Sequence, residues 1–292
     1  MHGLDSRSPR RARGLSLALA VALALTGLAG CGDAEPAPAT ERVEYVAIGD
    51  SYTATGLPVA AGRCQQSSQN YPHLIALERP EIVLFDASCS GAETRDTRKP
   101  QKASGVMINP TPQFDQLSGD TDLVTVSLGG NDHAYFVSSV LQCASMSRED
   151  PEGAPCADAN GDRLERHLDD IHRNLVDVLE EVQQLAPDAR VLMVGYPRLL
   201  PDRGDCPARI PLAEGDVDFS RERVAELVDA QRRAAEDAGV EYVDVWSASE
   251  GHDICGEDPW VNDLTPGPGG AHPYHPTPAH QRAVAGLILE ML

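Results

Sequence analysis

The chain has 292 residues, of which 41% are hydrophobic, so it can bury a sizeable core in one α/β domain or two small ones. Its formal net charge is −21, because 45 acidic residues outnumber 24 basic residues. Nucleic-acid binding depends on neutralising phosphates with lysine and arginine, so this charge balance excludes a nucleic acid as a partner.

The first thirty residues have the pattern of an export signal. Basic residues precede an apolar run, Leu15–Leu25, that is too short to span a bilayer as a mature helix. The run closes with Leu28-Ala29-Gly30-Cys31, which resembles a bacterial lipobox and implies cleavage before Cys31 and lipidation of its sulfur. The alternatives are a plain secreted protein and, from Arg10-Arg11, twin-arginine export.

We therefore divide the chain into a lipoprotein signal peptide over residues 1–30, a flexible tether over 31–42 and one domain over 43–292. The protein is expected to be exported. It is either secreted or held at the outer side of the membrane through the N-terminal lipid alone, and we expect a monomer.

The first predicted strand ends in a serine. The apolar run Val43–Ile48 breaks at Gly49-Asp50-Ser51, where small and polar residues take over. In open α/β sheets the ligands bind at the carboxyl ends of the strands, so Ser51 can be presented to a substrate there. The alternative is a simple turn, because all three residue types favour turns.

Two later strands end in the same way. Ile82–Phe85 leads into a loop that contains Gly91, and Leu123–Leu128 ends at Gly129-Gly130-Asn131. Unrelated turns would have no reason to gather at one edge of a sheet. The pattern therefore favours a shared ligand-binding edge.

Helical patterns alternate with the strands. The first predicted helix starts at Asn70. Apolar residues at steps of three and four predict a second helix over Leu164–Leu185, with Asp162 as its cap. A third helix is predicted from Ser220 to Gly239, and the last from about Thr277 to Met291. Val191–Val194 and Val240–Val245 supply the fourth and fifth strands.

This alternation predicts the fold class: a single doubly wound, five-stranded parallel sheet with helices on both faces. The stretches 132–159 and 246–274 are expected to be loops that shape a binding cleft.

Beyond Cys31, the cysteines form an even set: Cys64, Cys89, Cys143, Cys156, Cys206 and Cys255. In an exported protein six cysteines indicate three disulfides, with 15 possible connectivities. The alternative is a zinc site, which the absence of any Cys-x-x-Cys spacing disfavours.

Four short motifs follow one another along the chain: Gly49-Asp50-Ser51, Gly91, Gly129-Gly130-Asn131-Asp132 and His275-Pro276-Thr277. They resemble the SGNH (GDSL) hydrolase superfamily, in particular its secreted bacterial lipase and esterase branch with three disulfides. The resemblance covers about Tyr45 to Leu292. It implies a flavodoxin-like sheet with strand order 2-1-3-4-5, a serine esterase, and sequential pairing of the cysteines as Cys64–Cys89, Cys143–Cys156 and Cys206–Cys255.

The chemistry of acyl transfer assigns roles to these blocks. Ser51 is the expected nucleophile, and His275 is the base, because a histidine can take the serine proton near neutral pH. The resemblance implies an oxyanion hole made by the backbone N–H groups of Ser51 and Gly91 and the side-chain amide of Asn131. Glycine allows close backbone approach, and asparagine supplies donors that carry no charge.

One position departs from the commoner family pattern. Many members carry an aspartate three residues before the catalytic histidine, whereas this chain has His272 there. We predict that the backbone carbonyl of His272 orients His275, which gives a Ser–His dyad. Asp263 and Asp253 are the alternative carboxylates, and Asp50 is expected to fix its own loop through nearby backbone N–H groups.

The predicted function is hydrolysis of carboxylic esters, of lipid or other acyl groups, through an acyl-enzyme intermediate. A carbohydrate deacetylase and a ligand-binding lipoprotein without catalysis are the alternatives. His272, His275 and His280 could also form a metal site, but a serine with an oxyanion hole requires no metal or cofactor, and we expect none. The expected partner is a small-molecule or lipid ester.

Overall fold

In the computed structural model, which describes residues 42–56, 62–265 and 272–292, five parallel strands form a central sheet. These strands are β1 (Val43–Gly49), β2 (Ile82–Asp86), β5 (Leu123–Ser127), β6 (Arg190–Val194) and β7 (Glu241–Val243), in the spatial order β2-β1-β5-β6-β7. The predicted fold class and strand order are confirmed. The predicted signal peptide, lipidated Cys31 and the predicted tether up to residue 41 lie outside the described residues.

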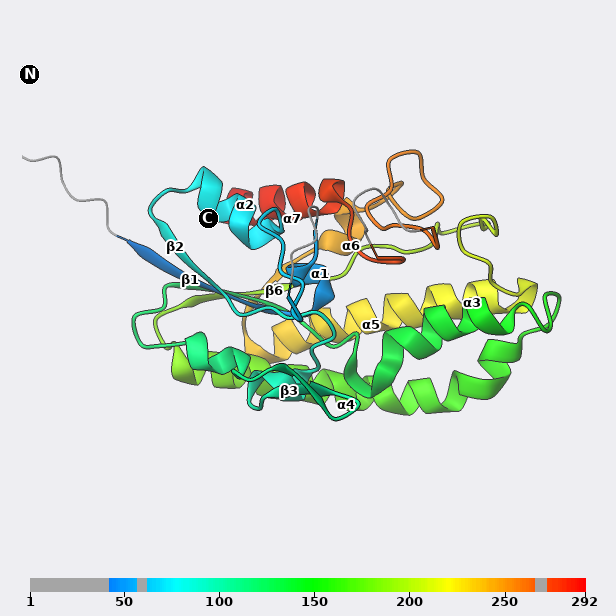
Figure 1. Ribbon diagram of the computed structural model, residues 1–292, viewed down its shortest axis with the longest axis horizontal. Coiled ribbons are helices and arrows are strands. Elements are labelled where there is room, and N and C mark those ends of the chain that lie inside the picture. Colours follow the sequence, from blue (N-terminus) through cyan, green and yellow to red (C-terminus); the bar gives the residue numbers. More distant parts are fainter. Residues whose placement is uncertain (1–41, 57–61, 266–271) are drawn as a thin grey trace, which may run out of the picture. The chain divides into compact units, whose positions relative to one another are not determined.

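Helices cover both faces of the sheet, because side chains along a strand point alternately to opposite sides. Val46 and Ile48 of β1 enter one apolar cluster, beneath α4 (Pro155–Leu185) and α5 (Val217–Ala238). Tyr45 and Ala47 enter the other, beneath α2 (Tyr71–Glu78) and α7 (Pro278–Met291). Figure 1 shows the two helical layers on either side of the strands.

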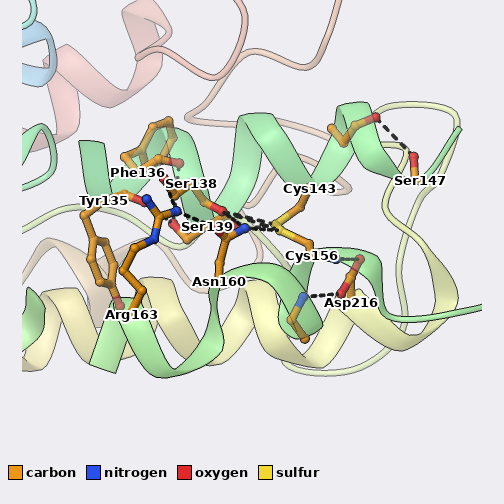
Figure 2. The surroundings of a disulfide bond; sticks show 12 residues. Tyr135, Phe136, Ser138, Ser139, Cys143, Ser147, Cys156, Asn160, Arg163 and Asp216 are labelled. Atoms are coloured by element: carbon orange, nitrogen blue, oxygen red, sulfur yellow. Dashed lines mark hydrogen bonds between the residues drawn. A yellow bond between two sulfur atoms is a disulfide. The ribbon is translucent and has the colours of Figure 1, made fainter. Parts of the chain in front are cut away.

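Two predicted helix starts are wrong. The helix expected to begin after Asp162 begins at Pro155, and the one expected at Ser220 begins at Val217. For α4 the reason lies in the tertiary structure: the carboxylate of Asp216 accepts hydrogen bonds from the backbone N–H groups of Cys156 and Ala157, at 3.0 and 2.9 Å, and so caps α4 from a distant segment (Figure 2). No local sequence signal identifies such a cap.

The expected loop over 132–159 is also a misprediction. It contains three short helical segments, η3 (Asp132–Ala134), η4 (Val137–Leu141) and α3 (Gln142–Met146), and then the start of α4. By contrast, the described part of 246–274 is irregular apart from the end of α6 (Val245–Ala248).

The smaller elements are α1 (Ser51–Ala54), η1 (Thr94–Thr97), η2 (Gln113–Gln116), η5 (Glu214–Asp216) and a hairpin of β3 (Gln101–Ala103) and β4 (Val106–Asn109) that the sequence patterns did not predict. The described residues belong to one compact unit, Thr40–Leu292. Among them, none of the helices combines the length and the apolar character needed to cross a bilayer.

The six cysteines pair in sequential order, as the resemblance implies: Cys64–Cys89, Cys143–Cys156 and Cys206–Cys255. The second bond joins α3 to the first turn of α4 (Figure 2), and the third links two irregular segments 49 residues apart.

Removal of the third disulfide, by Cys206→Ser with Cys255→Ser, is expected to lower the free energy of unfolding by about 4 kcal/mol. In the chain-entropy description a cross-link stabilises the fold by restricting the unfolded chain, and a closed loop of about 50 residues gives this value. Removal of the second disulfide, whose cysteines are 13 residues apart, should cost about 3 kcal/mol. Denaturant unfolding of both double variants measures the two losses of stability. A larger loss on removal of the second disulfide, which closes the shorter loop, would contradict the prediction.

Candidate active site

Ser51 is the first residue of α1, immediately beyond β1. Asp50 caps this helix, and its Oδ1 accepts the backbone N–H of Tyr52 at 2.8 Å, which confirms its predicted role in fixing the loop. Gly49 has no room for a side chain, because a Cβ there would lie 2.1 Å from Oγ1 of Thr53. The tight turn therefore requires glycine and delivers the serine to the end of the strand.

Hydrogen bonds bring the other two loops beside this turn. The backbone N–H of Cys89 donates to the carbonyl of Gly49 at 3.0 Å, and the N–H of Asp50 donates to the carbonyl of Ser127 at 3.1 Å. The loops after β2 and β5 therefore flank Ser51 on its two sides, as expected for neighbouring strands of one sheet edge.

Asn131 lies at the same cavity as Ser51. Its Nδ2 donates to the carbonyl of Ala92 at 3.1 Å and to Oδ2 of Asp50 at 3.3 Å. The second contact is long and correspondingly weak. An oxyanion could therefore replace Asp50 as the acceptor of this N–H, while the hydrogen bond to Ala92 keeps the Asn131 amide in place.

Gly91 has φ of 76°, a conformation that favours glycine. Its backbone N–H has no acceptor within the described part of the chain. It is exposed and is not among the residues that line the cavity with Ser51 and Asn131, although its loop is tied to Asn131 through Ala92.

His275 comes to the cavity from the other end of the chain. Its Nδ1 lies 2.8 Å from the carbonyl oxygen of Pro273. The prediction that the His272 carbonyl orients the ring is therefore wrong; that carbonyl accepts the backbone N–H of His275 instead, at 3.4 Å. Tyr274 has φ of 59°, and this left-handed turn directs the Pro273 carbonyl at the imidazole.

Neither alternative carboxylate contacts His275. Oδ1 of Asp253 accepts the backbone N–H of Cys255 at 2.9 Å, and Oδ1 of Asp263 accepts that of Thr265 at 2.7 Å. Across the described residues, the Pro273 carbonyl is the hydrogen-bond partner of the His275 ring.

The segment that carries His275 is anchored to the serine turn. The hydroxyl of Tyr52 donates to the carbonyl of Tyr274 at 2.9 Å, and the Tyr52 and His275 rings stack with centroids 6.2 Å apart. The backbone N–H of Asn262 donates to the His275 carbonyl at 2.9 Å. Within residues 42–56, 62–265 and 272–292, Ser51 Oγ and the His275 ring form no direct hydrogen bond, a contact that often tightens only when substrate binds.

Tyr196 is a site residue that the sequence reasoning missed. Its hydroxyl donates to Oδ2 of Asp50 at 2.6 Å and accepts the backbone N–H of Gly130 at 3.1 Å. Burial raises the pKa of Asp50 to about 7, and the hydrogen bond from Tyr196 opposes this effect. Tyr196 directly follows β6 and its adjoining Gly195, so the strand-end rule that selected Ser51 would also have found it.

The cavity beside Ser51 has both polar and apolar lining residues. Ser51, Asn131 and His275 are among the polar ones; the apolar wall is formed by Phe136, Val137, Leu141, Pro197, Leu199, Val224 and Leu227. The cavity has a volume of about 100 Å³. The segment 132–146, expected to be a loop, thus supplies one side of the wall from helical turns.

The three histidines considered for a metal site do not gather into one. His280 is buried with its ring centroid 6.0 Å from that of Tyr52 and 6.1 Å from that of Trp260. In the part of the chain that the structure describes, no three histidine, cysteine, aspartate or glutamate side chains are grouped closely enough to hold a metal ion.

With His275 as the general base that the sequence predicts, the pH dependence of kcat/KM is expected to follow the deprotonation of its imidazole. Burial lowers the pKa of this imidazole below its usual value of about 6.5, and the nearby His272 lowers it further, while the bond to Pro273 raises it. A general base must be neutral, so the acid limb should have its midpoint below pH 6.5 and activity should stay level above it. His272→Gln should move the midpoint to higher pH; a midpoint above 6.5 in the unaltered protein would contradict the assignment.

An open parallel sheet that presents a serine, a histidine and an asparagine amide at one cavity is the arrangement expected of a serine ester hydrolase. The chain matches the GDSL-like lipase/acylhydrolase family over residues 47–283 and belongs to that family. It is therefore a carboxylic ester hydrolase.

Named relatives agree with this class. The chain is 39% identical over 273 residues to Lipase 2 of Streptomyces coelicolor, with 89% of each chain covered. It is similar to the crystal structure of phospholipase A1 from Streptomyces albidoflavus, at a TM-score of 0.68 and 27% identity, over 86% of this chain and 100% of that one. The fold is also that of an extracellular lipase from Streptomyces rimosus, at a TM-score of 0.70, 24% identity and coverage of 86% and 100%.

Proposed function

We propose that Ser51 and His275 catalyse ester hydrolysis as a dyad. His275 takes the proton of Ser51 while Oγ bonds to the ester carbonyl carbon, and the imidazolium then protonates the alcohol as its bond to that carbon breaks. Water, deprotonated by the same imidazole, releases the acid and restores the serine. The observation that carries the proposal is that the two side chains, brought from opposite ends of the domain, line one cavity.

The oxyanion would be stabilised by the N–H of Ser51 at the start of α1 and by Nδ2 of Asn131, which both line the cavity. The N–H of Gly91, which lies outside the lining but one residue from the Ala92 carbonyl that holds Asn131, would be the third donor. The Pro273 carbonyl holds the base in one orientation and, being uncharged, stabilises the imidazolium less than a carboxylate would. Asp50, with Tyr196 and the Tyr52 N–H, has a positioning role.

The substrate that we propose is an ester of a medium or long acyl chain. Seven apolar side chains line the cavity that Ser51 also lines, which is more apolar surface than an acetyl group would contact. The relative named phospholipase A1 supports a lipid ester, and those named lipase support the same class. We also propose that the protein acts outside the cell, secreted or anchored by lipid on Cys31.

Esters of acetate, butyrate, octanoate and dodecanoate test the acyl chain. We expect kcat/KM to rise with the length of the acyl chain. In Leu227→Trp, whose larger side chain fills part of the cavity, we expect kcat/KM to fall selectively for the longer esters. Leu77→Trp, on the exposed side of α2, is the matched control and should leave the profile unchanged. Preference for acetate in the unaltered protein would favour the deacetylase, and failure of a serine-directed phosphonate to label Ser51 would contradict the dyad.

A further inference from the structure

The hairpin of β3 and β4 projects from the domain next to the Gly91 loop. Residues 102–107 are all exposed, and the chain reverses through Ser104 and Gly105, which have φ of 49° and 79°. At the base of the hairpin Gln101 is buried, and its Nε2 donates to the carbonyl of Ser90 at 2.9 Å. The hairpin is therefore fixed to the loop that borders the catalytic edge.

Positive charge gathers on this projection although the chain as a whole is strongly acidic. Both lysines of the protein, Lys99 and Lys102, are exposed here, and a guanidinium N–H of Arg63 donates to the carbonyl of Met107. Arg95 and Arg98, close by, form ion pairs with Glu93 and Glu181. Over the described residues, Arg63, Lys99 and Lys102 have no acidic partner.

The same projection exposes apolar side chains. Val106 is 51% exposed and Met107 is 39% exposed, and Met107 is paired in register with Lys102. The other large exposed hydrophobic side chains of the described residues stand singly along the chain. A shallow hollow is lined by Arg95, Asp96, Lys99, Pro100, Lys102 and Met107, so three basic groups and apolar groups share one surface with a single, buried carboxylate.

We propose that this hairpin patch, made of Arg63, Lys99, Lys102, Val106 and Met107, binds the surface of an anionic lipid bilayer. Basic side chains are attracted to anionic headgroups, and apolar side chains at the tip enter the boundary between headgroups and acyl chains. The −21 charge of the whole chain would repel such a surface, so binding has to occur through this local patch. Docking there places the catalytic edge next to lipid, because Gln101 holds the hairpin to the loop of Gly91.

The inference extends the proposed lipid ester substrate, but binding is measured without turnover, so the two can fail separately. The chain from Thr40 onward, the compact unit of the structure, is prepared with Ser51→Ala so that vesicles are not hydrolysed. Its partitioning is measured by co-sedimentation with vesicles of phosphatidylcholine alone and with added phosphatidylglycerol. Activity of the matched proteins that keep Ser51, on a soluble short-chain ester, verifies that each variant is folded.

The unaltered hairpin should give stronger partitioning to the anionic vesicles, and salt should weaken it. Lys99→Gln with Lys102→Gln should reduce the partition coefficient about 25-fold, since each basic residue contributes about fivefold. Val106→Ser with Met107→Ser should reduce it more than about tenfold. Arg148→Gln with Arg203→Gln makes the same charge change at two other exposed positions and should alter it less than twofold.

Three outcomes would overturn the proposal. The first is no preference for anionic vesicles. The second is an equal loss in the Arg148 and Arg203 control, which would show that net charge alone matters. The third is binding to soluble polyphosphate that is as tight as binding to vesicles and insensitive to the Val106 and Met107 changes, which would assign the patch to an anionic polymer.

Discussion

Replacing Ser51 by alanine is expected to lower kcat for soluble esters by at least about 10⁴-fold. The change removes the atom that forms the acyl-enzyme, and the activity that remains comes from the oxyanion donors and from substrate binding alone. The measurement is the steady-state hydrolysis of a butyryl or octanoyl ester, with a phosphonate probe to count the reactive serines.

Ser145→Ala, an exposed serine of α3, is the matched control and should keep full activity and full labelling. His275→Ala should reduce kcat to a similar extent as Ser51→Ala, and the double variant should be no worse than either single one, because the two groups act as a unit. Equal rates in Ser51→Ala and the unaltered protein would refute the assignment of the nucleophile.

Replacing Asn131 by alanine is expected to lower kcat by about 10²–10³-fold with little change in KM. Loss of one preorganised oxyanion donor has this effect because the donor acts on charge that develops only in the transition state. Kinetics with one soluble ester, measured above the pH of the acid limb, separate kcat from KM.

Asn174→Ala provides the control for simple loop disturbance. Its Nδ2 supports the same loop by donating to Oδ2 of Asp132 at 3.2 Å, but it is not a lining residue of the cavity. We expect less than about a tenfold loss there. A loss at Asn174 as large as that at Asn131 would mean that Asn131 acts through the position of its loop and not as a donor.

The sequence predicted the site most successfully where a short rule linked residue type to sheet geometry. Ser51 and Asn131 were found because each follows a buried strand, and parallel strands end at one edge. The same rule applies to Tyr196, which was overlooked because Pro197 and the residues after it suggested only a loop. The Tyr196 hydroxyl oxygen nevertheless lies 2.6 Å from Oδ2 of Asp50.

Errors concentrated where the partner comes from far along the chain. Asp162 was chosen as a helix cap from its local pattern, whereas Asp216 supplies the cap of α4 from 60 residues away. The carbonyl that orients His275 was misplaced by one residue, because the left-handed turn at Tyr274 decides which carbonyl faces the ring.

By itself, the sequence determined the five-stranded parallel sheet, the edge that carries the chemistry and the side chains that could perform it. Those features follow from hydrophobic periodicity and from residue types that acyl transfer needs, and both are local properties. Only the tertiary structure decided that the Pro273 carbonyl faces the His275 ring, that Asp50 is buried against Tyr196, and that η4 and α5 line an apolar cavity beside Ser51. These contacts join segments far apart in the chain, and their geometry arises when the helices pack on the sheet.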